Sequence, residues 1–367
     1  MKILITTGIY PPEIGGPATY TKLLEENFRK IGIDVGVLPF RVVRFLPKVI
    51  RHFVFVIHVL LKSVNTNIIY AQDPVSVGLP SLIASKIMRK KFIIRVAGDY
   101  AWEQSRQRYK VTDSIDNFQD KNYGFRVEFM RSIQKFVVRR ADKIITPSLY
   151  FSNLVSKWMS NRKIKIKIET VYNGIDFKEL PRADSGYQYK PKTIISAGRL
   201  VPWKGFEMLI GSLVELQDWK LFIAGEGPEE LNLKKTAENL EVKDRVIFLG
   251  KLEREHLAKF IKNCEIFALN THFESFSFQV VESMYVGTPV ISTLTGSIPE
   301  IIESMKSGIL ITPDDKLEFI KSVEKLSSDF GFREKITAEA EKRSRDFSIE
   351  NTVGKTLNII ENILVNK

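Results

Sequence analysis

Short apolar runs of the β type alternate with helical patterns along the whole chain, and this alternation restricts the fold more than any other feature. Parallel strands need a helical crossover between them, so the alternation predicts an α/β protein with parallel sheets covered by helices on both faces. The predicted strands are 2–6, 35–38, 68–70, 92–96, 143–146 and 169–172, followed by 193–196, 220–224, 246–249, 265–269, 290–293 and 308–311.

The chain has 367 residues, which is the length of two domains of average size. We place the boundary in 178–192, because this segment is polar, contains two prolines and has little apolar periodicity. The predicted domains are therefore 1–177 and 190–347. A last helix over 348–367 carries apolar residues along one face, which must be buried: Ile349, Val353, Leu357, Ile360 and Leu364.

Composition excludes several classes of protein. A hydrophobic content of 44% and a charged content of 27% are typical of globular chains. The single cysteine, Cys264, excludes a disulfide framework and indicates a reducing, cytoplasmic setting. The longest uncharged apolar run, 52–61, is about half the length of a membrane span. The net charge of +12 predicts an anionic partner, and lipid, nucleic acid and phosphorylated small molecules all qualify.

The segment 270–303 contains the most informative polar residues. Its pattern predicts a strand end, a polar loop, a helix over 278–285 and a second strand. Two carboxylates and two serines that can cap the helix lie there: Glu274, Ser275, Ser277 and Glu282. Ligands bind beyond the carboxyl ends of parallel strands, and amides at a helix N-terminus bind phosphate. Carboxylates beside such amides predict a ligand with both hydroxyls and phosphates, such as a sugar nucleotide.

Two further loops follow predicted strands and carry glycines or cations. In SAGRLVPWKGF, Arg199 and Lys204 combine a planar guanidinium with a point charge, which suits a diphosphate. In GIYPPEIGGPATY, Gly15 and Gly16 allow a ligand to approach the backbone. Surface cations are usually solvated and a glycine pair usually forms a turn, so neither loop alone establishes a site.

Six motifs, taken in order, resemble the family 4 retaining glycosyltransferases of the GT-B fold. They are GGP near the start, NGID before the boundary, GRLVPWKG, AGEGPE, two glutamates separated by seven residues, and GSIPE. The resemblance covers essentially the whole chain. It implies two Rossmann-like domains that face each other across a central cleft, with the C-terminal helix crossing back to the N-terminal domain. The first domain would bind the acceptor and the second the nucleotide-sugar donor.

The resemblance also implies roles for individual residues. Arg199 and Lys204 would bind the donor diphosphate, Glu274 the hydroxyls of the transferred sugar, and Glu282 the ribose. The other implied donor contacts are Gly15, Gly16, Glu226, Ser275, Phe276, Ser277 and Phe278. Cations and helix amides can stabilise the departing diphosphate, so we expect neither a metal ion nor another cofactor.

One position departs from the family pattern. In FIIRVAGDYAWE the family usually has a histidine near the donor sugar, where this chain has Ala97. We expect Asp99 or Tyr100 to fill part of that role, and Glu13 is a further candidate for contact with the sugar or the acceptor. The substitution leaves the sugar preference open.

The segment 41–63 combines basic and apolar residues, and 35–72 contains no acidic residue. A helix with this composition is typical of a segment that lies in an anionic membrane surface. The apolar side could equally pack on the first domain. Nucleic acid fits less well, because no recognised module or stacking platform accompanies the charge.

We therefore predict a metal-independent, retaining hexosyltransferase that uses a nucleoside diphosphate sugar. Its expected acceptor is a glycan, plausibly lipid-linked and part of the cell envelope, and the expected location is the cytoplasm or the inner face of the membrane. Two alternatives stay open: a sugar-nucleotide 2-epimerase of the same architecture, and a catalytically silent protein that binds glycan or membrane. Donor alone would yield an epimer in the first case, and no turnover would occur in the second.

Overall fold

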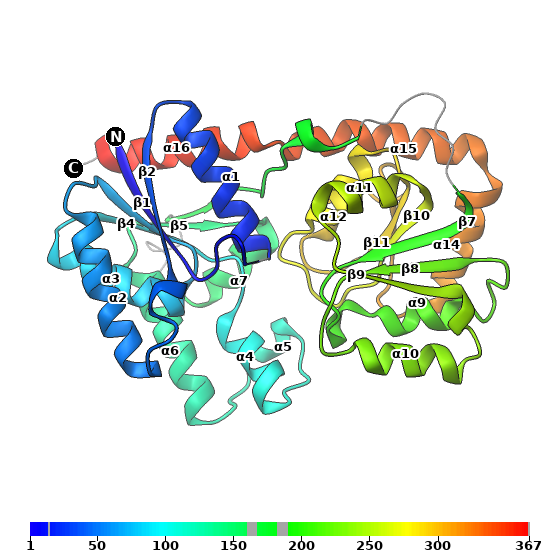
Figure 1. Cartoon of the computed structure of the whole chain (residues 1–367), viewed down its shortest axis with the longest axis horizontal. Helices are drawn as coiled ribbons and strands as arrows, with labels where there is room; N and C mark the ends of the chain where they lie inside the picture. The colour runs from blue at the N-terminus through cyan, green and yellow to red at the C-terminus, as the bar shows by residue number, and fades with distance from the viewer. Residues whose placement is uncertain (14, 160–166, 182–189, 366–367) are drawn as a thin grey trace. The chain divides into compact units, whose positions relative to one another are not determined.

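The computed structural model describes residues 1–13, 15–159, 167–181 and 190–365 (Figure 1). The chain divides into two compact units. Unit 1 comprises Met1–Gly174 and Ile349–Lys367, and unit 2 comprises Ile175–Ser348. The first crossing between the units thus lies at Gly174, ahead of the predicted boundary segment 178–192, of which residues 182–189 lie outside the described part of the chain.

Unit 1 is built on a parallel sheet of strand order β2-β1-β3-β4-β5-β6. Its strands are β1 (Lys2–Thr7), β2 (Asp34–Pro39), β3 (Ile68–Ala71), β4 (Lys91–Arg95), β5 (Lys143–Thr146) and β6 (Ile168–Thr170). Its helices are α1 (Gly16–Lys30), α2 (Lys48–Ser63), α3 (Leu79–Ile87), α4 (Tyr100–Tyr109), α5 (Ile115–Phe118), α6 (Phe125–Arg140), α7 (Leu149–Lys157) and α16 (Ile349–Val365), with the short turns η1 (Phe40–Val43) and η2 (Pro74–Gly78).

Unit 2 repeats this architecture with the strand order β12-β11-β10-β7-β8-β9. Its strands are β7 (Lys190–Ala197), β8 (Lys220–Ala224), β9 (Val246–Gly250), β10 (Cys264–Leu269), β11 (Val290–Thr293) and β12 (Ile309–Ile311). Its helices are α9 (Phe206–Ser212), α10 (Glu230–Asn239), α11 (Arg254–Lys262), α12 (Phe278–Tyr285), α13 (Ile298–Ile301), α14 (Lys316–Ser328) and α15 (Phe330–Ser344), with the short turns η3 (Phe177–Glu179), η4 (Pro202–Lys204), η5 (Lys243–Arg245) and η6 (Arg345–Phe347).

All the strands predicted from the sequence are present, and the prediction of two parallel sheets is confirmed. The strands are predictable from the sequence because helices cover both faces of each sheet, so the strands appear in the sequence as continuous apolar runs. In β3 and β10, for example, every residue is buried. Each fully buried Ile, Leu or Val side chain contributes about 1.5–3 kcal/mol to the free energy of folding.

The last helix, α16, packs on unit 1, as predicted. Ile349, Val353 and Ile360 join the core of unit 1 with Ile5 of β1 and Phe28 of α1, and the predicted Leu357 and Leu364 pack against that core while partly exposed. The Thr352 hydroxyl of α16 also donates a hydrogen bond to the Tyr172 carbonyl (2.8 Å). The C-terminal segment therefore completes the first unit.

Each sheet contains one point at which the chain reverses its direction of progress across the sheet. In unit 1 this point lies between β1 and β3, and in unit 2 it lies between β7 and β10. The loops that leave the carboxyl ends of two such strands diverge to opposite faces and leave a crevice, where ligands of open α/β sheets bind. The fold thus marks one candidate site in each unit.

Candidate functional site

The loops after β7 and β10 in unit 2 hold most of the predicted donor residues. The backbone of the η4 turn is tied to the β10 loop, because His272 N donates to the Trp203 carbonyl (2.8 Å). The Asn270 side chain donates to the Gly205 carbonyl (3.1 Å). Gly205 has φ = +57°, and a Cβ there would lie 2.2 Å from the Asn270 carbonyl oxygen. Only glycine allows this approach, which places Lys204 over the β10 loop.

Lys204 and Glu274 form an ion pair across these two loops. Both side chains are largely buried, with 14% and 11% of their surfaces exposed. The Glu274 backbone is fixed from the other side, because its carbonyl accepts a hydrogen bond from Ser297 N (3.0 Å). Arg199, Lys204 and Glu274 are the residues that the resemblance implies to be catalytic, and the structure brings the last two together.

Arg199 and Glu226 lie on the adjacent loops after β7 and β8. Both are exposed, and within the described residues neither side chain has a hydrogen-bond or ion-pair partner. Their loops pack backbone against backbone: a Cβ on Gly225 would lie 1.9 Å from the Gly198 carbonyl oxygen. The glycines of GRLVPWKG and AGEGPE therefore hold the two loops together, and Arg199 stays available to an anion beside Lys204.

Helix α12 begins at Phe278 and ends at Tyr285, as predicted. Ser277 is the N-cap, and its hydroxyl accepts from Val280 N (3.4 Å), whereas Ser275 lies before the cap. Phe276 is buried and packs edge-to-face on Phe278, with ring centroids 5.7 Å apart. The first turn of α12 thus points its partial positive charge toward the loop that carries Glu274.

Glu282, on α12, is buried and has a partner that the sequence analysis missed. Arg254 Nε, at the start of α11, lies 2.6 Å from Glu282 Oε1. Burial raises the pKa of the Glu282 carboxyl, and the nearby Arg254 guanidinium opposes this rise. Arg254 also donates to the Asp176 carbonyl (3.3 Å), in the NGID motif. No sequence spacing indicates this link between α11, α12 and NGID.

A second group missed by the sequence analysis braces the β10 loop from the far side. Asp314 accepts a hydrogen bond from the Asn270 amide (2.7 Å) and lies 2.8 Å from His272 Nε2. Asp314 has φ = +63°, and its backbone N–H donates a further hydrogen bond to Asn270 Oδ1 (3.0 Å). This network fixes the loop that presents Glu274.

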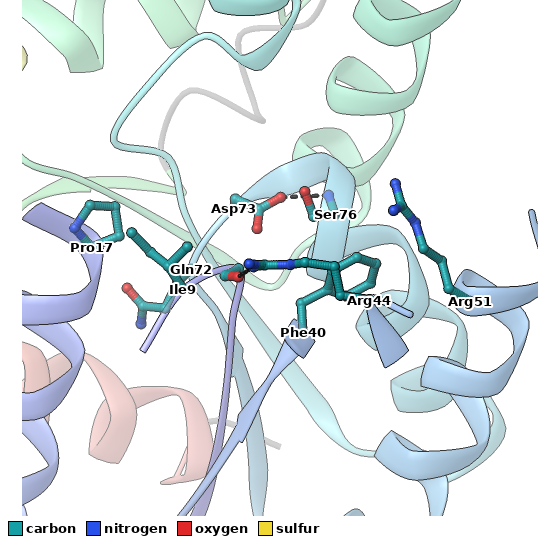
Figure 2. Close-up of a pocket in the computed structure, with 9 residues that line it drawn as sticks. Ile9, Pro17, Phe40, Arg44, Arg51, Gln72, Asp73 and Ser76 are labelled. Atoms are coloured by element: carbon teal, nitrogen blue, oxygen red, sulfur yellow. Dashed lines mark hydrogen bonds between the residues drawn. The ribbon is translucent and has the colours of Figure 1, made fainter. Parts of the chain in front are cut away.

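Unit 1 contains a pocket of about 300 Å³ at its own reversal point (Figure 2). It is lined by Gly8, Ile9, Pro17, Phe40, Arg44, Arg51, Gln72, Asp73 and Ser76. These residues come from the loops after β1, β2 and β3 and from α1 and α2. The pocket therefore lies where the topology predicts a ligand site.

Charged groups give the pocket a mixed character. Asp73 Oδ1 accepts from Val75 N (3.0 Å) and Ser76 N (2.6 Å), and burial raises the pKa of the Asp73 carboxyl. Arg51 reaches the pocket from α2, stacks over the Phe40 ring (5.4 Å) and has no ion-pair partner among the described residues (Figure 2).

Gln72 is buried, and its amide makes no hydrogen bond with the described residues. The nearby Tyr70 hydroxyl instead lies 3.1 Å from the Tyr20 hydroxyl. A buried amide without a partner costs stability, and such groups occur where a ligand or a water completes the site.

Three of the predicted unit 1 residues lie around this pocket. Glu13 forms an ion pair with Arg44, which lines the pocket. Burial and the Asp73 carboxylate of the pocket raise the pKa of the Tyr100 phenol. Gly15 has φ = +149° and precedes α1, which begins at Gly16. Pro17, in the first turn of α1, lines the pocket.

Asp99 is fully buried and does not reach the pocket. Its carboxylate caps α4 by accepting from Trp102 N (3.1 Å) and also accepts from the side chains of Gln119 (2.9 Å) and Gln134 (2.9 Å). These contacts give Asp99 a structural role in joining α4, α5 and α6. An Asp immediately before a helix is an N-cap signal that the sequence already contained.

Two features are absent from the described residues. No group of three or more His, Cys, Asp and Glu side chains is placed to hold a metal ion. No described helix combines the length and the apolar character needed to cross a bilayer.

Comparison with known proteins relates the chain to glycosyltransferases. Residues 177–343 match the model for glycosyl transferases group 1. An uncharacterized glycosyltransferase of Methanocaldococcus jannaschii is 27% identical and covers 98% of this chain and 97% of its own length. N-acetyl-alpha-D-glucosaminyl L-malate synthase of Bacillus anthracis is 24% identical over 86% of this chain and 85% of its own length. These matches support a GT4-like glycosyltransferase, with the group 1 family model covering residues 177–343.

The fold of this glycosyltransferase agrees with the assignment. HepE of Anabaena, solved in complex with UDP, superposes with a TM-score of 0.76 over 99% of this chain and 100% of its own, at 18% identity. The predicted GT-B fold is thereby confirmed. The sequence matches confirm the predicted GT4-like type and the hexosyltransferase type of enzyme. In this glycosyltransferase the matched segment 177–343 lies within unit 2, which holds Arg199, Lys204, Glu274 and Glu282.

Proposed function

We propose that this glycosyltransferase transfers a hexose from a uridine diphosphate sugar to an acceptor hydroxyl, with retention of configuration and without a metal ion. The observation that carries the proposal is the Lys204–Glu274 pair at the reversal point of unit 2, with the unpaired Arg199 on the same β7 loop as Lys204. UDP is the proposed nucleotide because HepE, which has the same fold, is described in complexes with UDP and with UDP and glucose.

The pair has two halves that match the two chemical parts of such a donor. Lys204 and the guanidinium of Arg199 attract the diphosphate, and Glu274 accepts hydrogen bonds from sugar hydroxyls. Within the pair the ammonium and the carboxylate neutralise each other, so neither charge is buried alone. A donor that supplies an anion and hydroxyls together can replace both contacts at once. A ligand with only one of these parts would leave a buried charge unpaired.

The proposed chemistry places charge stabilisation on the departing nucleotide. As the glycosidic bond breaks, negative charge grows on the β-phosphate, and Arg199, Lys204 and the N-terminal turn of α12 lie ready to bind it more strongly than in the ground state. Two fixed cations can supply this compensation, so the proposed mechanism needs no divalent ion. Activity should therefore persist in EDTA, and the product should keep the anomeric configuration of the donor in NMR spectra.

For the acceptor we propose a lipid-linked glycan that binds in the pocket of unit 1. The pocket offers Asp73, Gln72 and Ser76 to hydroxyls and Arg51 to an anionic group. We also propose that the protein works at the cytoplasmic face of the membrane as a peripheral protein, where such acceptors are presented.

A binding and turnover experiment tests the proposal. Purified protein is screened by thermal shift against UDP-, GDP-, ADP- and TDP-sugars, because a donor that binds only the folded form raises Tm. Turnover is then followed with the stabilising donor, with and without a panel of lipid-linked and free glycans. Transfer by wild type and loss of transfer in Arg199→Gln supports the proposal. A C2 epimer formed from donor alone, or donor binding without any turnover, contradicts it.

A further inference from the structure

The helices α2, α3 and α6 lie in a row on unit 1, with α3 contacting both α2 and α6 (Figure 1). Large apolar side chains are exposed on all three, with 42–84% of each residue accessible to solvent. We call this surface the α2–α3–α6 face. Its apolar members are Ile50, Phe53, Ile57 and Leu61 on α2, Ile83 and Ile87 on α3, and Phe125, Phe129 and Phe136 on α6.

Helix α2 shows most clearly that this face lacks a cover. Ile50, Phe53, Ile57 and Leu61 follow one another at spacings of three, four and four residues, which places them in one line along the helix. A different side of α2 buries Phe55 and Val59 completely in unit 1. The helix therefore has two apolar sides, and unit 1 covers only one of them. Large apolar patches are rare on the surfaces of monomeric proteins and often mark binding sites.

The charges around the face are almost all positive. The three helices contain nine Lys and Arg residues and one acidic residue, Glu128. Glu128 is itself paired with Arg131 (2.9 Å). Arg140 stacks over Phe136 (5.0 Å), so one cation lies directly on an apolar residue of the face. Long basic side chains beside apolar ones can keep their charged ends at lipid phosphates while the apolar residues enter the hydrocarbon.

The combination of exposed apolar residues and positive charge on this face fits one kind of partner better than the others. A second copy of the chain would bring nine basic residues against another nine, which opposes association. A nucleic acid would match the charge but leave Ile50, Ile57 and Leu61 against a polar backbone. An anionic bilayer matches both the charge and the apolar residues. We propose that the α2–α3–α6 face docks on the surface of a membrane that contains anionic phospholipid.

The inference deepens the proposed function and rests on it for the lipid-linked acceptor. Helix α2 carries the exposed line and also Arg51, which lines the unit 1 pocket. Docking through α2 would place the pocket next to the headgroup layer. A lipid-linked acceptor could then reach Arg51 with its lipid tail still in the bilayer.

Vesicle binding by the full chain tests the docking directly. Sedimentation is measured with vesicles of phosphatidylcholine alone and with about 30% phosphatidylglycerol. We expect binding to the anionic vesicles, weaker binding at about 0.5 M salt, and little binding to phosphatidylcholine. The double variant Phe53→Ser/Ile57→Ser should lower the partition coefficient about 100-fold, because each side chain loses its transfer into lipid. Phe125→Ser/Phe129→Ser should have a similar effect.

The matched control changes apolar residues of similar exposure in unit 2. Leu231 on α10 and Leu317 on α14 are 72% and 68% exposed, close to the 68% of Phe53. Leu231→Ser/Leu317→Ser should therefore bind vesicles like wild type. Equal binding by the control and by Phe53→Ser/Ile57→Ser would overturn the proposal, as would an absence of binding to anionic vesicles. A lipid-free dimer that Phe53→Ser/Ile57→Ser converts to a monomer would instead assign the face to a second copy and overturn it as well.

An activity measurement separates this inference from the proposed function. The Phe53→Ser/Ile57→Ser variant should lose transfer to an acceptor embedded in anionic vesicles but keep wild-type transfer to a water-soluble analogue of that acceptor. If transfer proceeds normally and vesicle binding fails, only the docking is wrong. If vesicle binding occurs without donor turnover, only the proposed function is wrong.

Discussion

Lys204 and Glu274 stand 70 residues apart in the sequence and form a largely buried ion pair between the η4 turn and the β10 loop. Their side chains are 14% and 11% exposed. A buried pair adds little net stability, yet the loss of one partner is costly because the other charge stays buried. This asymmetry suits a site that exchanges the pair for a ligand, and it gives the first prediction.

Neutralising one member of the pair should destabilise the ligand-free protein far more than neutralising both. We expect Lys204→Met and Glu274→Gln each to lower the free energy of unfolding by about 3 kcal/mol. The double variant should regain most of that loss and remain inactive. Urea unfolding of the wild type, the two single variants and the double variant measures the coupling free energy between the two side chains.

The exposed pair Lys316–Glu215 (2.8 Å) is the control, since its side chains are 41% and 45% exposed. Lys316→Met should cost less than about 1 kcal/mol. If the Lys204 and Glu274 effects simply add, the two side chains are not coupled as the structure shows.

Arg199→Gln should affect activity without affecting stability. Arg199 is exposed and has no partner among the described residues, so its removal should change the free energy of unfolding by less than about 0.5 kcal/mol. If it binds the departing diphosphate, kcat should fall about 100-fold. Steady-state kinetics with the identified donor measure the effect, and the exposed Lys235→Gln on α10 serves as a charge-matched control. If both variants have the same kinetics, Arg199 does not bind the departing diphosphate.

Glu282→Ala should weaken nucleotide binding. If the carboxylate holds the ribose, the Kd for UDP should rise about tenfold, because a charged hydrogen bond is lost. Isothermal titration calorimetry measures this. Glu255, exposed on α11 and paired with Lys259 (2.7 Å), provides the comparison, and Glu255→Ala should bind UDP normally. An unchanged Kd in Glu282→Ala would show that Glu282 does not bind the ribose and has only its structural ion pair with Arg254.

Asp73→Asn should stabilise the protein at neutral pH and not at acidic pH. Burial raises the folded-state pKa of Asp73 above its unfolded value. The contribution of Asp73 to stability is therefore present below the unfolded pKa and is lost as the pH rises through the folded pKa. Asparagine keeps an oxygen for Val75 N and Ser76 N and carries no charge. Tm measured against pH should show the variant above wild type at neutral pH and equal to it near pH 4, about the unfolded value.

Asp113→Asn should show the opposite sign. Hydrogen bonds from Lys121 and Tyr123 lower the pKa of the Asp113 carboxyl, so its contribution is present above the unfolded pKa and is lost as the pH falls through the folded pKa. This variant should melt below wild type at neutral pH. If Asp73→Asn and Asp113→Asn shift Tm in the same direction at neutral pH, the two carboxyl groups do not have opposite pKa shifts.

Cys264 should resist thiol reagents while the protein is folded. The residue is 4% exposed, and burial raises the pKa of its thiol to about 12. At about pH 8 almost no thiolate is present, and the reagent cannot reach the sulfur. Labelling with Ellman's reagent should be slow and should follow unfolding, whereas protein in guanidinium should react at once. Fast labelling of the folded chain would show that β10 opens locally.

Local patterns made the fold and part of the site predictable. The strands of both sheets, α12 over Phe278–Tyr285 and the Ser277 cap all follow from periodicity and capping residues within a few positions. The same reasoning failed to separate the two apolar sides of α2, because Phe53 and Phe55 look alike in the sequence. Asp99, expected with Tyr100 as a candidate sugar contact, caps α4, and its position immediately before that helix already indicated the cap.

The sequence by itself determined two parallel α/β units and the residue types of a nucleotide-sugar site, because hydrophobic periodicity and helix caps act over short separations. Only the tertiary structure decided which charges meet. Lys204 with Glu274, Arg254 with Glu282 and Asn270 with Asp314 are joined by the order of strands in the sheet, which brings the ends of distant loops together. The exposure of Phe53 beside the burial of Phe55 was decided in the same way, by which side of α2 packs on unit 1.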